Sequence, residues 1–497
     1  MKKILCLTLA LFLSLAALCS CGKKEDTPAG EDKGNVLESE HFTVDINLYN
    51  YFFVGTFNQF YQSYGQFASS LFDMTKPLSE QDCSRIGGEG YTWFDYFSDG
   101  TKDLLSTYVI MAEEAIAGGY TLSGQEQKDI DDQIEESESY AKENGYDDAN
   151  GMLRAQYGDG VTVDTVRKAI ELYTYAYNGR QALVKTFDTS DERIEEFVTE
   201  NPDKAYVADF LVLRFGEDKS DASDEEKAAA LEKNRSDAQA FADAAAGEED
   251  FLKKAEEYYR SAYTVVTDEE KKAMDSSETA DVLSETELSS KVSACKNYNT
   301  AYNTASEAGK WIFGDGRAAG DKNVIADSAT SMAEAYLIVT PSHRDNSTTV
   351  DVRHILIADD DDAKAKARAE ELLAEWKTDP TEEHFASLAT ENTTDTASAA
   401  DGGLYAGLTE GQTVTEFNDW CFDSVRKAGD TDIVKTDFGY HIMYFVGKGV
   451  EVWKNKVITA IEDADYEEAY KKLSEKYKLS FNEDRIKTLA SFTPQAS

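Results

Sequence analysis

The sequence predicts an α+β protein of several domains, with helical regions near both ends and mixed helix-and-strand modules between them. At 497 residues the chain is too long for one hydrophobic core, and about three domains are expected. Apolar and aromatic residues recur at three- and four-residue spacing in 36–203 and again in 450–497, which is typical of amphipathic helices. Between them, runs such as VRHILI at 352–357 and HIMYFV at 441–446 have the length and apolar character of strands.

Residues 1–21 predict a lipoprotein signal peptide. Lys2 and Lys3 precede an apolar stretch over 4–18, which suits a signal peptide and is short for a membrane span. The stretch ends in LCSCG at 18–22, which resembles a bacterial lipobox with Cys21 as the lipidated residue. The alternative is a plain secretory signal with incidental cysteines. Acylated Cys21 would anchor the protein at the extracytoplasmic face of the bacterial cell membrane without spanning it, through a polar tether at 22–35.

The charge of the chain excludes one class of partner. The chain has 95 acidic and 50 basic residues, a formal net charge of −45, whereas nucleic-acid binding depends on Lys and Arg contacts to phosphate. Such a surface would attract basic or unfolded polycationic partners, or would serve only solubility. Beyond the signal peptide and Cys21, three scattered cysteines form neither a disulfide framework nor a zinc pattern. We interpret Cys421 as a small buried hydrophobe.

Residues 36–203 are predicted to be helical. An aromatic stripe at three- and four-residue spacing forms either core or a surface for client proteins; it consists of Phe53, Phe57, Phe60, Tyr61 and Tyr64. Capping boxes at 123–126 and 189–192 mark helix starts. At the other end of the chain, Trp453, Val457 and Ile461 at four-residue spacing predict a helix that continues through Tyr477.

Two histidines lie in distinctive surroundings. His354 lies in VRHILI at 352–357 and His441 lies in FGYHIM at 438–443, with Gly402-Gly403, Gly411-Gln412 and Glu416-Phe417 between them. This arrangement resembles the parvulin family of peptidyl-prolyl cis/trans isomerases (rotamases). Through YTWF at 91–94 and YTLS at 120–123, residues 36–203 resemble the helical chaperone region of SurA-like and PrsA-like foldases. In similar foldases, a C-terminal segment such as 450–497 returns to pack on the N-terminal helices.

The resemblance implies a fold and a site for residues 346–449. The expected fold is a four-stranded antiparallel sheet covered by helices, with the two histidines on adjacent central strands. The catalytic residues would be His354, Asp395, His441 and Thr436, the histidines being hydrogen-bonded to each other and supported by the Thr436 hydroxyl. Asp395 would hydrogen-bond to His354 and tune the electrostatics around the twisting carbonyl. The alternatives are that the two histidines are ordinary core residues and that Asp395 forms an Asx-turn in a loop.

The resemblance also implies a proline pocket at Tyr405, Thr413 and Phe417, although Phe417 could equally be an ordinary core residue. Thr413 replaces the family's usual Met, and the lost apolar contact could reduce proline binding by about 1 kcal/mol. Four aspartates at 359–362 would repel a phosphorylated peptide, so no phosphopeptide preference is expected. Isomerisation requires neither nucleophile nor metal, and no cofactor is expected.

Residues 204–345 predict a second, divergent parvulin-like module with an insertion within 216–300. WIFGDGRAAGD at 311–321 matches WCFDSVRKAGD at 420–430 in Trp, Phe, Arg, Ala, Gly and Asp at identical spacing. In this alignment Asp209 replaces His354 and Met332 lies opposite His441. A chance match over one short window is the alternative.

Two functions remain open. The first is a membrane-anchored foldase that isomerises Xaa-Pro bonds in unfolded exported proteins and also acts as a chaperone. The alternative is a chaperone or holdase whose parvulin domain only binds peptides, as the loss of the first copy and Thr413 suggest. A solute-binding lipoprotein fits poorly, because no alternating strand–helix lobes occur.

Overall fold

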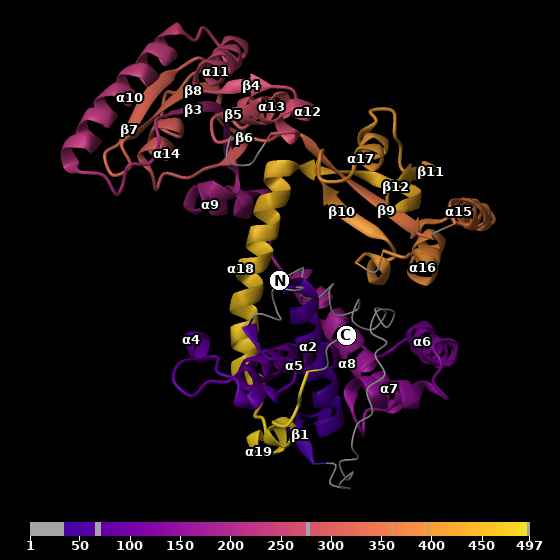
Figure 1. The fold of residues 1–497 in the computed structure, drawn as a ribbon. Coiled ribbons are helices and arrows are strands. Elements are labelled where there is room, and N and C mark those ends of the chain that lie inside the picture. Colours follow the sequence, from indigo (N-terminus) through magenta and orange to yellow (C-terminus); the bar gives the residue numbers. More distant parts are fainter. Residues whose placement is uncertain (1–33, 65–70, 275–278, 360, 396, 495–497) are drawn as a thin grey trace. The chain divides into compact units, whose positions relative to one another are not determined.

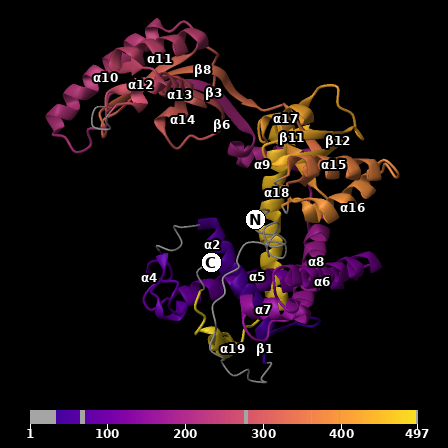
Figure 2. The same cartoon turned by 45° about the vertical axis from the view of Figure 1, so that its right-hand side comes forward.

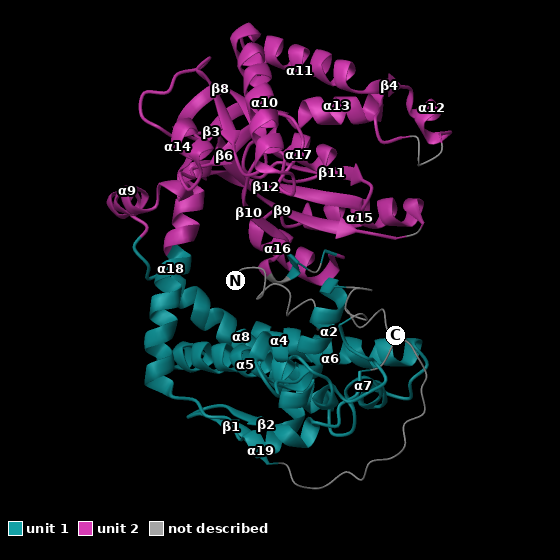
Figure 3. Ribbon diagram, turned by 60° about the vertical axis from the view of Figure 1, so that its left-hand side comes forward, with its two compact units in different colours: residues 1–188, 395–400, 462–497 teal, residues 189–394, 401–461 magenta. Residues whose placement is uncertain are grey.

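The computed structural model describes residues 34–64, 71–274, 279–359, 361–395 and 397–494. The chain divides into two compact units, shown in Figure 3: unit 1 comprises 1–188, 395–400 and 462–497, and unit 2 comprises 189–394 and 401–461. The predicted signal peptide, Cys21 and most of the tether lie outside the described residues. Helices combined with antiparallel sheets confirm the predicted α+β class. Within the described part of the chain, no helix is both long and apolar enough to cross a bilayer.

Unit 1 is mainly helical, as the periodicity predicts. A short antiparallel hairpin of β1 (Asn35–Glu38) and β2 (Thr43–Asp45) precedes the helices. The helices are α2 (Ile46–Tyr64), α4 (Ser84–Gly87), α5 (Trp93–Ala117), α6 (Gly124–Glu143), α7 (Ala149–Tyr157), α8 (Val163–Val184) and α19 (Glu483–Ile486), with single 3-10 turns at 78–80 and 487–489. The capping box of Ser123 and Glu126 is formed. The one predicted at 189–192 is wrong, because Ser190 caps α9 through Arg193 N.

The aromatic stripe of α2 lies mostly in the core of unit 1. Phe53 and Phe57 are buried, and the Phe57 ring lies 5.2 Å from that of Phe97 on α5 in an edge-to-face arrangement. Only Tyr64 at the end of α2 is largely exposed, at 52%. Since each buried aromatic ring removes a large apolar area from water, this cluster contributes strongly to the stability of the unit.

The C-terminal segment is divided between the units. Helix α18 (Val452–Tyr477) begins in unit 2, where Val457 and Ile461 pack with the residues of α9 (Asp191–Glu200). From residue 462 onward the segment belongs to unit 1, where Phe492 O accepts a hydrogen bond from Leu78 N at 3.1 Å. The first part of the 450–497 segment therefore packs on α9, the last helix of the region predicted at 36–203, and Tyr466 and Ile486 lie in the core of unit 1.

Unit 2 contains two modules, which we name the first module (206–344) and the second module (348–451). The first consists of β3 (Tyr206–Phe215), α10 (Asp224–Ala244), α11 (Glu248–Ala262), β4 (Thr264–Val266), α12 (Asp268–Lys272), β5 (Val282–Ser284), α13 (Glu285–Ser293), β6 (Lys296–Ala301), α14 (Glu307–Ile312), β7 (Lys322–Asp327) and β8 (Met332–Arg344). The second consists of β9 (Thr348–Ile357), α15 (Asp362–Trp376), α16 (Glu382–Asn392), β10 (Leu404–Leu408), α17 (Thr415–Phe422), β11 (Thr431–Thr436) and β12 (Gly439–Glu451). Strand β12 therefore continues beyond the boundary predicted at residue 449.

The two modules have the same sheet topology (Figure 1). Their four-stranded antiparallel sheets have the orders β6-β3-β8-β7 and β10-β9-β12-β11, which are identical when strands are matched in chain order. In the second module α15 and α16 cover one face and α17 covers the other, as Figure 2 shows from a second angle. The parallel pair β4-β5 with α12 and α13 is an addition to the first module.

The motif shared by the modules has the same local structure in both. Gly320 and Gly429 have φ of +87° and +88°, a left-handed conformation that favours glycine. Gly320 N donates to Ile338 O and Gly429 N donates to Phe445 O, both at 2.8 Å. The motif arginine also lies over the motif tryptophan in each module, Arg426 on Trp420 in the second. Matched sequence, topology and hydrogen bonds support an internal repeat rather than a chance match.

Candidate functional site

The two histidines meet on one face of the second module's sheet. His354 on β9 pairs with Met443, and His441 on β12 pairs with Leu356, so the histidines are diagonal neighbours. Because side chains alternate along a strand, both lie on the face that α17 covers. The two Nδ1 atoms are 3.1 Å apart, and the residues are 2% and 5% exposed. The expected meeting of the two histidines is therefore observed.

Thr436 extends this pair into a hydrogen-bonded chain. Thr436 Oγ1 lies 2.9 Å from His441 Nε2 and accepts a hydrogen bond from Phe438 N at 3.1 Å. The hydroxyl keeps its proton and a second lone pair, so it can donate to His441 Nε2 or accept from it. When it donates, His441 carries its proton on Nδ1 and donates it to His354 Nδ1, which leaves the proton of a neutral His354 on Nε2. The direction of the Thr436 hydrogen bond is thus coupled to the tautomer of each ring.

Two aromatic rings border the histidines. The Tyr405 ring from β10 lies 4.6 Å from the His354 ring, and the Phe417 ring from α17 lies 5.3 Å from both imidazoles in edge-to-face arrangements. Phe417 is 2% exposed and belongs to the apolar cluster between α17 and the sheet, so it is both a core residue and a neighbour of the site. Cys421 in the same cluster is buried, which confirms its interpretation, and burial raises the pKa of its thiol to about 12.

Thr413 and Asp395 lie in loops. Thr413 is partly buried in the turn between β10 and α17. Asp395 belongs to the segment 395–400 that groups with unit 1; its carboxylate accepts hydrogen bonds from Ala397 N at 3.2 Å and from Ser398 Oγ at 2.7 Å. These bonds form the Asx-turn arrangement that was the alternative to a catalytic role.

The loop after β9 carries exposed carboxylates. Asp359 and Asp361 are exposed, and Asp361 caps α15 through Ala363 N at 3.1 Å. Asp362 pairs with Lys435 and accepts a hydrogen bond from the Tyr440 hydroxyl at 2.9 Å. The remaining aspartate of this run, Asp360, lies outside the described residues. Asp361 also pairs with Lys364 at 3.9 Å, so two of the three described aspartates have a lysine partner.

The first module has other residues at both histidine positions, and they are not the residues expected. Tyr336 pairs with Val212 as Met443 pairs with His354, so Val212 occupies the position of His354. By the same register Glu334 occupies the position of His441. The alignment of Asp209 and Met332 with the histidines was wrong for two reasons. The turn before β8 (328–331) is longer than the turn before β12 (437–438), and short apolar runs match in several registers.

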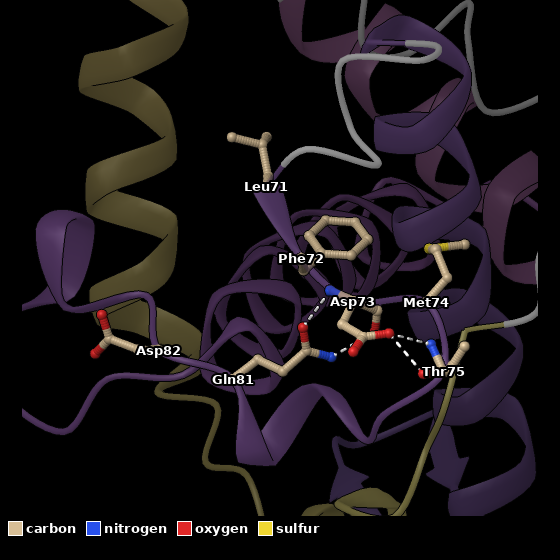
Figure 4. A pocket seen from close by; sticks show the side chains of 7 residues that line it. All are labelled: Leu71, Phe72, Asp73, Met74, Thr75, Gln81 and Asp82. Atoms are coloured by element: carbon tan, nitrogen blue, oxygen red, sulfur yellow. Dashed lines mark hydrogen bonds between the residues drawn. The ribbon is translucent and has the colours of Figure 1, made fainter.

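Unit 1 contains a separate pocket, shown in Figure 4 and lined by Leu71, Phe72, Asp73, Met74, Thr75, Gln81 and Asp82. The Gln81 side chain bridges the loop, accepting from Asp73 N at 2.6 Å and donating to Asp73 O at 2.9 Å. Hydrogen bonds from Thr75 lower the pKa of Asp73 to about 2. The Asp73 carboxylate is therefore held within the loop by these hydrogen bonds.

Among the described residues, no group of three or more His, Cys, Asp or Glu side chains could hold a metal ion. Sequence reasoning did not identify Arg353, whose guanidinium holds the glycine pair 402–403 by hydrogen bonds to Asp401 O and Gly402 O. The available signal was a lone arginine inside the apolar run that carries His354.

A four-stranded antiparallel sheet with paired histidines beneath an aromatic wall defines a parvulin-type domain. Residues 336–448 match the family described as PPIC-type PPIASE domain. The chain is 36% identical to foldase protein PrsA 1 of Listeria innocua over 99 residues, and 33% identical to foldase protein PrsA of Exiguobacterium sibiricum over 102 residues. Each alignment covers 20% of this chain and 31% of the relative, so the chain spans about a third of the length of these relatives.

Two solved structures also resemble the chain. PrsA from Bacillus subtilis is matched over 80% of this chain and 93% of that chain, with 17% identity and a TM-score of 0.26. Peptidylprolyl isomerase (PrsA) from Bacillus anthracis is matched over 28% of this chain and 64% of that chain, with 21% identity and a TM-score of 0.19. On the family match and the curated relatives, the second module, most of which lies within the matched residues, is a parvulin-type peptidyl-prolyl isomerase domain of the PrsA-like kind.

Proposed function

We propose that this protein is an extracytoplasmic, membrane-anchored foldase that isomerises Xaa-Pro bonds in exported proteins and also acts as a chaperone. The observation that carries the proposal is the buried chain His354–His441–Thr436 beneath Tyr405 and Phe417, in a domain of the PPIC type. The clients would be unfolded exported proteins, and the net charge of −45 would attract their basic segments.

The reaction requires shape and electrostatics rather than a nucleophile. Rotation about the Xaa-Pro bond must overcome a barrier of roughly 18–20 kcal/mol that arises from amide resonance. A catalyst lowers this barrier by binding the twisted amide more tightly than the planar one. In this proposal Phe417 and Tyr405 hold the proline ring and exclude water, while Thr413 contributes the loop side of the pocket. The ordered imidazoles supply a fixed pattern of N–H and lone pair beneath the rotating bond.

Asp395 has a supporting role in the proposal. Its bonds to Ala397 N and Ser398 Oγ hold the loop that follows α16, and the carboxylate adds negative charge to that loop. An Asp395→Asn variant keeps the geometry of the loop and removes the charge. Reduced activity without lost stability would favour the electrostatic role, whereas unchanged activity would leave the residue as a loop turn.

The exposed aspartates after β9 support a preference against phosphorylated substrates. The negative charges of these aspartates would repel a phosphorylated residue that precedes the proline of a substrate. A phosphopeptide that is turned over faster than its unmodified twin would contradict this part of the proposal.

Membrane attachment rests on the sequence alone. Cys21 would be acylated after removal of residues 1–20, which would hold the protein at the outer face of the cell membrane. A Cys21→Ala variant should fail to incorporate labelled fatty acid and should leave the membrane fraction. Labelling of this variant equal to that of the wild type would contradict the anchor.

A non-catalytic holdase is the second candidate, and two observations favour it. The first module carries Val212 and Glu334 at the histidine positions, and Thr413 reduces the apolar surface of the pocket. An isomerisation assay with an unphosphorylated Xaa-Pro peptide, run beside an aggregation assay with an unfolded client, separates the two candidates. The foldase should be active in both assays. Activity in the aggregation assay alone would establish the holdase.

A further inference from the structure

Arg353 lies beside His354 on β9, but its side chain takes the opposite face of the sheet. The side chain is 16% exposed, and Nε donates to Glu382 Oε1 of α16 at 3.0 Å. Nη1 donates to Asp401 O at 2.5 Å and to Gly402 O at 3.0 Å. One guanidinium therefore joins strand β9, helix α16 and the loop that leads into β10.

The loop that Arg353 holds is tightly confined. Gly402 and Gly403 have φ of +62° and +72°, which favours glycine. A Cβ at Gly402 would lie 2.6 Å from Ala386 Cβ, and a Cβ at Gly403 would lie 2.2 Å from His354 O. Gly403 O also accepts a hydrogen bond from His354 N at 2.9 Å. The path of the loop is thus fixed against the backbone of the site histidine.

This loop sets the position of Tyr405. Leu404 pairs with Arg353 and Tyr405 with Val352, but the register between β10 and β9 shifts after Tyr405. Strand β10 is also at the edge of the sheet, so its ladder to β9 gives it little support. The side chain of Tyr405 reaches its place 4.6 Å from the His354 ring directly after the section that Arg353 anchors.

The first module provides an internal comparison. Val212 N donates to Cys295 O at 2.9 Å, which is the counterpart of the bond from His354 N to Gly403 O. In this register Leu211 occupies the position of Arg353 and Asn297 that of Tyr405. A leucine offers no donor to the loop carbonyls. The arginine anchor therefore occurs in the module that has the histidines and the aromatic residue, and not in its counterpart.

We propose that Arg353 is a positioning residue for the histidine site, which holds the loop 401–403 and thereby keeps Tyr405 against His354. The inference rests on the proposed isomerase function and identifies a residue through which that site is assembled. Arginine suits the role, because its planar fork can serve two carbonyls and a carboxylate at once, whereas lysine offers a single charged point.

The test compares Arg353→Leu, which introduces the residue of the first module, with Arg353→Lys and a control, Arg368→Leu. Arg368 lies in the same module on α15 and pairs with Glu371 and Asn392, outside the loop. In the full-length protein labelled at histidine, the imidazole resonances of His354 should shift in Arg353→Leu, because the Tyr405 ring has moved. The resonances of His384 on α16 should stay in place in every variant.

Kinetics give the second measurement. For an unphosphorylated Xaa-Pro peptide, Arg353→Leu should raise KM by about 10-fold with kcat less affected, since the lost contact serves proline binding. Arg353→Lys should recover part of the loss, and Arg368→Leu should match the wild type. A folded Arg353→Leu protein with unshifted His354 resonances or an unchanged KM would overturn the inference.

Two further outcomes also test the role of Arg353. If Arg353→Leu does not fold, Arg353→Lys takes its place, and a smaller shift of the same His354 resonances is required. If the wild type shows no isomerase activity, the proposed function is wrong, whatever the role of Arg353. The positioning role is then judged by the His354 shift and by the Kd for the same peptide, which should rise in Arg353→Leu and remain unchanged in Arg368→Leu.

Discussion

His354 Nδ1 and His441 Nδ1 lie 3.1 Å apart between two adjacent strands, in a position almost closed to water. Only one of two neutral imidazoles can donate across this contact, so the pair requires a third group to select the direction of the bond. Thr436 Oγ1 lies 2.9 Å from His441 Nε2 and would select this direction by donating its proton to that nitrogen. The site is therefore a chain of three side chains rather than two independent histidines.

Removal of the Thr436 hydroxyl should allow His441 to adopt both tautomers. Thr436→Val keeps the volume but leaves His441 Nε2 without this partner, and we expect kcat/KM to fall by about 10-fold. Imidazole nitrogen shifts of His441 should show a mixture of tautomers in place of one. Thr436→Ser should retain the single tautomer and most of the activity, and equal losses in the two variants would contradict the hydroxyl's role.

Thr413 should limit the affinity of the pocket for proline. Thr413→Met restores apolar surface at this position, and about 1 kcal/mol of additional binding corresponds to a KM up to about 5-fold lower. Steady-state isomerisation of one Xaa-Pro peptide by both proteins measures the change. A KM that is unchanged or higher in Thr413→Met would show that residue 413 does not contact the proline.

Gly403 should tolerate no side chain. Gly403→Ala combines a φ of +72° with a Cβ 2.2 Å from His354 O, and we expect it to destabilise the second module by about 2 kcal/mol or more. Gly411→Ala is the matched control, since Gly411 has a φ of +85° but has nothing within 4 Å of its Cβ. Hydrogen exchange of β9 and β10 in the full-length proteins measures the difference. Equal protection from hydrogen exchange in the two variants would contradict a steric clash at Gly403.

The sequence predicted which side chains meet in the second module better than the register of the first. The resemblance to parvulins pointed to both histidines, Thr436, Tyr405 and Phe417, and the structure brings these side chains together. Val212 and Glu334 were not found, because their alignment depends on the length of the turn at 328–331 and on irregular pairing near Asp209. Arg353 was missed for a different reason: its partners are backbone carbonyls from a distant loop, which no local pattern reveals.

Unit 1 should respond to pH through His41 and Glu113. His41 Nδ1 lies 2.7 Å from Glu113 Oε2, and this hydrogen bond raises the pKa of His41 above its usual 6.5. Burial alone would raise the pKa of Glu113, but hydrogen bonds from Ser39 and His41 lower it below its usual 4.5. The stabilisation by His41 is complete below pH 6.5 and is lost as pH rises through its raised pKa. The stabilisation by Glu113 is present above pH 4.5 and is lost as pH falls through its lowered pKa.

The pair should therefore stabilise the β1–β2 hairpin most between about pH 4.5 and 6.5. Hydrogen exchange of residues 35–45 in His41→Gln and in the wild type should differ most within this window and converge at alkaline pH. His384→Gln, which alters a histidine of the second module, serves as the control. A difference at residues 35–45 that grows as pH rises above 8 would contradict the assignment.

The central claim is that the paired histidines form an isomerase site, and the catalysed rate of cis-to-trans exchange in an unphosphorylated Xaa-Pro peptide tests it most directly. The full-length wild type should accelerate exchange, and His354→Ala and His441→Ala should each lose most of the acceleration, by about 10-fold or more. His384→Ala alters a half-buried histidine of α16 that contacts Asp379 O instead of the site, and this variant should retain the acceleration. A wild-type protein without acceleration, or histidine variants as active as His384→Ala, would contradict the claim.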